Sequence, residues 1–146
     1  MNFQDQQNIT GIFTLVVRDR DGRVLSIFEE KNLIVNGAKN QLARLIAGNV
    51  SNRHITHIGF GTGTTAANPN DTGLTNAFFK PITSVTYPAT GRVSFTWSLS
   101  TAEANGLAIT EFGLRCADLT LFARKQRAAI NKSDDISLDG TWTIIF

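Results

Sequence analysis

Apolar and hydroxyl-bearing side chains alternate along Val93-Ser94-Phe95-Thr96-Trp97-Ser98-Leu99-Ser100. Successive side chains of a β-strand point to opposite faces, so this stretch predicts a strand with one face in the core and a row of hydroxyls toward water. The chain around it has 146 residues, of which 42% are hydrophobic and 18% are charged. This length corresponds to one domain, and the low charge content with many Thr, Asn, Ser and Gly residues is typical of an all-β domain.

Short apolar runs separated by turn signals extend this pattern on both sides. We expect further strands over residues 12–17, 24–28 (continuing toward 33–35), 55–60, 78–87, 107–112, 121–124 and 142–146. Asp21-Gly22 lies between the first two runs and predicts a hairpin. The run over residues 12–17 has no proline and carries its nearest charges at its ends, which indicates a poorly protected edge strand.

One segment has a different period. The apolar residues of segment 37–47 recur at spacings of four, three and one, which predicts a short helix. Asn36 is suited to cap the start of this helix and Gly48 to end it. The sequence therefore predicts an antiparallel β-sandwich with one short α-helix (about residues 37–47). We expect a single sandwich domain over residues 9–146, preceded by a flexible polar arm of residues 1–8.

The charges of the chain are nearly balanced. Lys and Arg number 14 and Asp and Glu number 12, which does not favour nucleic acid as a partner. The alternative is a nucleic-acid surface in the last third of the chain, where cations surround Phe122: Arg115, Arg124, Lys125, Arg127 and Lys132. No apolar run approaches ~18 residues, so we expect no membrane-spanning helix.

The residue pattern predicts no catalytic residue, no cofactor and no metal site. His54 and His57 are three residues apart, which places them on opposite faces of a strand. Cys116 has no recognisable His partner, and we expect it to be a buried, inert thiol. Gly59-x-Gly61-x-Gly63 is not followed by the helix that a phosphate-binding loop requires, so turn or bulge glycines are the favoured interpretation.

Several stretches, taken in their order along residues 32–146, resemble a family of small structural proteins of tailed bacteriophages and prophages from the tail, baseplate and fibre region. They are 32–37, 42–48, 58–65, 71–74, 103–106, 109–114, 121–124, 130–133 and 142–144, and include Gly61-Thr62-Gly63-Thr64, Asp71-Thr72-Gly73-Leu74 and Leu121-Phe122-Ala123-Arg124. Relatives often have Asp-Gly before Thr120, where this chain has Leu119. Leu adopts a positive φ only at a cost, which disfavours a tight hairpin there.

The resemblance implies a non-enzymatic virion protein, present in several copies and assembled in the bacterial host cytoplasm. Its partners would be other virion proteins and copies of itself. A capsid decoration protein is the alternative within the virion. A carbohydrate-binding module at the tail tip is the alternative from another class, with Trp97, Trp142 or Tyr87 stacking on a sugar. Both tryptophans lie on strand faces whose other residues are apolar, so packing in the core is favoured over sugar binding for these two.

The long loop over residues 61–74 and the first strand are the expected contact regions. The loop is rich in Gly, Asn, Thr and Pro, has no regular period and carries Asp71 as its one ionisable residue. The candidate subunit contacts are Phe3, Ile12, Phe13, Thr62, Thr64, Thr65, Asn68, Asn70 and Asp71.

Overall fold

The computed structural model describes residues 8–146, so residues 1–7, which include most of the expected arm and the contact candidate Phe3, lie outside the described part of the chain. Nine strands and one helix make up the described fold. They are β1 (Thr10–Asp19), β2 (Val24–Ile34), α1 (Asn36–Ile46), β3 (Ile55–Gly61), β4 (Phe78–Pro81), β5 (Ser84–Thr86), β6 (Arg92–Leu99), β7 (Ala108–Cys116), β8 (Leu121–Asn131) and β9 (Ile136–Ile145). The predicted all-β fold with one helix is confirmed.

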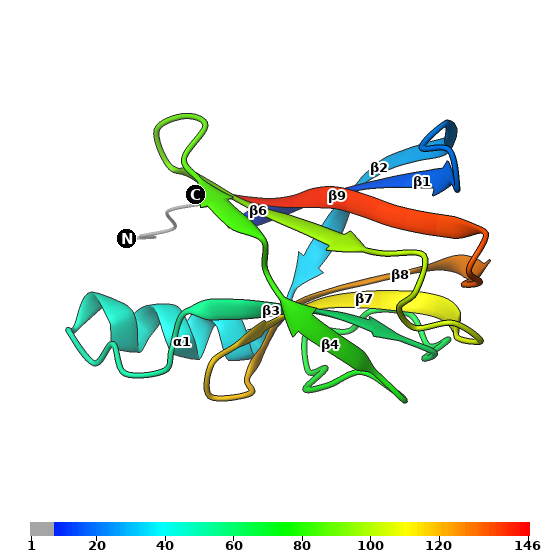
Figure 1. The fold of residues 1–146 in the computed structure, drawn as a ribbon. Coiled ribbons are helices and arrows are strands. Elements are labelled where there is room, and N and C mark those ends of the chain that lie inside the picture. Colours follow the sequence, from blue (N-terminus) through cyan, green and yellow to red (C-terminus); the bar gives the residue numbers. More distant parts are fainter. Residues whose placement is uncertain (1–7) are drawn as a thin grey trace.

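The nine strands form one continuous antiparallel sheet in the order β4-β3-β7-β8-β2-β1-β9-β6-β5. β2 connects the two halves, because it pairs with β1 over most of its length and with β8 through Leu33 and Ile34. The sheet is curled, so that the half with β1, β9 and β6 lies over the half with β7, β8 and β3 (Figure 1). The two halves are joined through β2, so a β-sandwich of two separate sheets is not confirmed.

Aromatic side chains fill the space between the two halves. The ring centroids of Phe13 on β1 and Phe112 on β7 are 4.8 Å apart, and those of Trp97 on β6 and Phe60 on β3 are 5.6 Å apart. Trp97 and Trp142 are fully buried, as the alternation predicted. Tilted and edge-to-face aromatic pairs of this kind add to the stabilisation from apolar burial.

The segment 78–87 is a bent connection rather than the single strand that the sequence predicted. Its first part, β4, pairs with β3, and its second part, β5, pairs with β6 at the other edge of the sheet. Between them the Ile82 N–H donates to Thr56 O at 2.9 Å, and the Thr83 N–H donates to Thr96 O at 2.9 Å. One short segment thus joins both edges of the curled sheet.

The prediction that residues 12–17 form an edge strand is wrong. β1 pairs with β2 on one side and with β9 on the other, so its backbone has partners along both edges. Phe13 is fully buried and cannot contact another subunit from this position, whereas Ile12 lies half-buried on the outer face. An apolar run bounded by charges is equally typical of a central strand, and only the strand order distinguishes the two.

α1 lies where the sequence predicted a helix, but its cap and the nearby β7–β8 turn differ from the prediction. α1 begins at Asn36, but its N-cap is Val35, without a side-chain cap, and Gly48 follows its end at φ +84°. The β7–β8 hairpin forms despite Leu119, which adopts φ +74° and donates its N–H to Cys116 O at 3.0 Å. The expectation that Leu119 disfavours a tight hairpin is therefore wrong.

Candidate functional site

A buried ionic network holds the long loop of residues 61–74 against the outer face of β7 and β8. Arg124 on β8 is 2% exposed, and its Nε donates to Glu111 Oε2 on β7 at 2.8 Å. Its other nitrogens donate to Asp71 Oδ2 at 2.9 Å and to Thr65 O at 2.8 Å. One guanidinium thus holds the loop at two points, and its planar fork is suited to such divergent acceptors.

The second carboxylate oxygen of the buried Glu111 fastens the two ends of the loop. Oε1 accepts the N–H of Gly63 at 3.0 Å and the N–H of Thr75 at 2.6 Å. Both oxygens of Glu111 are therefore satisfied, which is a requirement for a charge at 1% exposure. The Glu111 carboxylate therefore joins the two ends of the loop through backbone hydrogen bonds.

Gly59, Gly61 and Gly63 allow this close approach. A Cβ at Gly59 would collide with the ring of Phe79 and lie 2.8 Å from Leu74 Cδ1. A Cβ at Gly61 or Gly63 would lie 2.5 and 2.6 Å from the carboxylate of Glu111. None of the three has a positive φ. They are close-packing glycines, which differs from the turn or bulge role that the sequence suggested.

The loop is also fastened to the start of α1. The Asn36 N–H donates to Pro69 O at 2.8 Å, and the Asn36 side-chain amide donates to Asn70 Oδ1 at 2.9 Å. Asn36 therefore binds the loop rather than capping its own helix. Together with the Arg124 network, this contact fixes the loop at both its middle and its ends.

The predicted contact residues of the loop divide into an outward and an inward set. Thr64, Thr65, Asn68 and Asn70 are exposed. Thr62 and Asp71 are half-buried, and Asp71 is tied to Arg124. The structure thus presents a short row of hydroxyl and amide side chains on a rigidly held backbone. The sequence identified the loop but gave no signal for its anchor, since Asp71, Glu111 and Arg124 are far apart in the chain.

The cations considered as a nucleic-acid surface are engaged within the fold. Arg124 and Lys132 are each 2% exposed, and the Lys132 ammonium donates to Thr101 O, Asn105 Oδ1 and Ser133 O. The Arg115 guanidinium lies 3.7 Å from the centroid of the Phe79 ring. Arg127 and Lys125 lie over the ring of Phe28.

The other chemical candidates are placed as follows. Cys116 is a free thiol at 1% exposure, and its burial raises its pKa to about 11. The pKa of His57 is lowered by desolvation and, to a smaller extent, by the charge of Arg115. Within residues 8–146 no three His, Cys, Asp or Glu side chains gather as metal ligands would. The one helix of this region is too short to cross a membrane.

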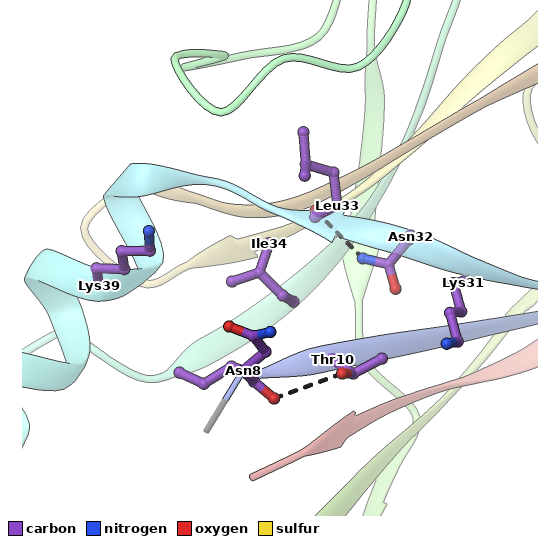
Figure 2. Close-up of a pocket in the computed structure, with 8 residues that line it drawn as sticks. Asn8, Thr10, Lys31, Asn32, Leu33, Ile34 and Lys39 are labelled. Carbon is purple, nitrogen blue, oxygen red and sulfur yellow. Dashed lines mark hydrogen bonds between the residues drawn. The ribbon is translucent and has the colours of Figure 1, made fainter. Parts of the chain in front are cut away.

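A cavity of about 530 Å³ lies between the start of β1, the end of β2 and α1. Its polar groups do not converge: Figure 2 shows Lys31 and Lys39 at opposite sides of the cavity, with Ile34 and Asn8 between them. Asn32 donates to Leu33 O at 3.3 Å, which is a contact within the cavity wall. The arrangement offers no built site for a defined ligand.

Comparisons with known proteins add no further constraint on the site. Neither a protein-family model, nor a curated protein, nor a solved structure matches the chain.

Proposed function

We propose that the chain is a non-enzymatic structural protein of a tailed-bacteriophage virion, assembled in several copies in the tail, baseplate or fibre-attachment region. The order of the sequence stretches that resemble such proteins supports this proposal. Asp71, Glu111 and Arg124 each lie in one of these stretches, and so do Gly63 and Thr65. The resemblance therefore coincides with the parts that build the loop anchor.

The rigidly held loop is the observation on which the proposal mainly rests. Exposed loops usually lose conformational freedom on binding, and this loss weakens the contact. Here the Arg124 network and Asn36 have already ordered the backbone behind Thr64, Thr65 and Asn68. A preorganised row of small polar side chains is suited to a specific contact with another virion protein.

Substitutions that leave the anchor intact test this role. Thr64→Arg and Thr65→Arg each place a large cation on the exposed row, while the backbone carbonyl of Thr65 stays available to Arg124. We expect both variants to keep the thermal stability of the wild type and to be lost from purified phage particles in an immunoblot. Thr83→Arg is the matched control, because Thr83 is an exposed hydroxyl residue of the connection between β4 and β5.

Other outcomes would contradict parts of the proposal. Wild-type protein that is absent from particles would refute the virion role, and normal incorporation of both loop variants would refute the contact role of the loop. Density on the capsid lattice in a particle reconstruction would support a decoration protein instead. Specific glycan binding that Tyr87→Ala abolishes would support a receptor-binding module, since Tyr87 is 79% exposed whereas both tryptophans are buried.

A further inference from the structure

Most of the large exposed hydrophobic residues gather at two opposite ends of the molecule. Val24, Leu25 and Ile27 lie at the start of β2, beside the β1–β2 turn. Ile46, Val50, Tyr87 and Phe146 lie at the other end, around α1 and the end of β9. β1 runs from one end to the other, since Thr10 pairs with Ile145 and Asp19 pairs with Ile136 (Figure 1).

The first surface, which we call the hairpin surface, consists of Val24, Leu25 and Ile27. Their exposed fractions are 49%, 58% and 71%. β2 is so exposed because it separates from β8: within residues 8–146, its partner along residues 24–32 is β1 alone. Figure 1 shows β2 and β8 diverging toward the β1–β2 turn. An apolar strand with one open edge is a strong site for association.

The second surface, the helix-end groove, is concave. A cavity of about 160 Å³ separates Leu45 of α1 from Phe95 of β6, and nearly all of its wall is apolar. An adjoining cavity of about 530 Å³ shares Val93 and Phe146 with it and extends to Tyr87. The two cavities therefore form one continuous and mostly apolar groove.

The two ends also differ in charge. Arg44, Arg53 and Arg92 lie around the groove; Arg53 pairs with Asp118 at 3.5 Å, whereas no ion pair within residues 8–146 engages Arg44 or Arg92. Residues 18–31 and 132–139, at the hairpin end, contain seven carboxylates and five cations. Glu29 lies on the same face of β2 as Ile27, because the register pairs them with Thr14 and Val16. Carboxylates thus flank the apolar side chains that would enter the cationic groove.

We infer that the hairpin surface of one copy docks into the helix-end groove of a second copy, head to tail. A groove-to-groove contact would bring together the Arg44 and Arg92 side chains of two copies, which is unfavourable. Contact between two different surfaces is heterologous, so it builds rings or open stacks rather than closed dimers. The inference deepens the proposed structural role, on which it rests for the presence of several copies, by naming the contact between those copies.

Two complementary defective variants test the contact in purified, full-length protein. Ile27→Asp removes the hairpin surface and Tyr87→Asp changes the groove, and both side chains are largely exposed, so folding is preserved. In sedimentation velocity we expect wild-type protein to self-associate, and each variant to raise the dissociation constant about tenfold or more. An equimolar mixture of the two variants retains one intact hairpin and one intact groove, and we expect it to form a one-to-one complex that does not grow.

The matched control is Ala66→Asp, because Ala66 is an exposed apolar residue of the 61–74 loop and lines neither surface. It should associate like the wild type. A wild type that stays monomeric at its highest attainable concentration overturns the inference, and so does a mixture that remains monomeric. The proposed virion role is measured separately, because Thr64→Arg should self-associate normally while failing to enter particles.

Discussion

Arg124→Met breaks the centre of the loop anchor while keeping much of the side-chain volume. The substitution leaves Glu111 charged at 1% exposure and leaves Asp71 and Thr65 O without their guanidinium partner. Removing one partner of a buried ion pair costs about 3–5 kcal/mol. Glu111 keeps its two backbone donors at Gly63 and Thr75, so we expect a loss near the lower limit, about 3 kcal/mol.

Urea denaturation followed by tryptophan fluorescence measures this loss. With a slope of about 2 kcal/mol per molar, the midpoint should fall by about 1.5 M. Arg20→Met is the matched control, because Arg20 is 60% exposed in its ion pair with Asp134 and should contribute less than about 1 kcal/mol. In Arg124→Met/Glu111→Gln the buried charge is removed but an acceptor remains, so about 1–2 kcal/mol should be regained. If Arg124→Met costs no more than Arg20→Met, the anchor does not stabilise the fold.

Three further substitutions or measurements test local features. Leu119→Gly should raise the free energy of unfolding by about 0.5–1 kcal/mol, since φ +74° strains Leu but not Gly; an unchanged midpoint would argue against strain. Gly59→Ala should lower it by about 1–3 kcal/mol because its Cβ meets the ring of Phe79, whereas Gly73→Ala, which meets nothing within 4 Å, should change it little. Cys116, with its pKa raised to about 11, should react with iodoacetamide at pH 8 far more slowly in the native protein than in urea, and equal rates would contradict its burial.

Local patterns predicted the elements well where the signal was contained in the segment itself. The alternation from Val93 to Leu99 describes β6, and Asp21-Gly22 marks the hairpin, where Gly22 has φ +83°. The predicted helix over residues 37–47 corresponds to Asn36–Ile46. Each of these features depends on neighbours a few positions apart.

Features that depend on distant partners could not be predicted in this way. The segment 78–87 has the composition of a strand, but its two halves bind opposite edges of the sheet. Phe146 alternates in register with Trp142 and Ile144, yet it lies beyond the end of β9 and is 56% exposed. Arg124 looked like part of a basic surface, because nothing near it in the sequence indicates that Glu111 and Asp71 would surround it.

The pairing of β1 with β9 has a consequence for synthesis of the protein. Thr14 lies opposite Thr141, which is 127 positions further along the chain, so most of the protein must be synthesised before this partner exists. Until then Phe13 and Leu15 can be covered only in part by the β1–β2 hairpin, which forms early because its contacts are local. The nascent chain therefore carries an apolar strand with an open edge through most of its translation, a state prone to aggregation. A chaperone that binds extended apolar segments would act on β1 during this interval.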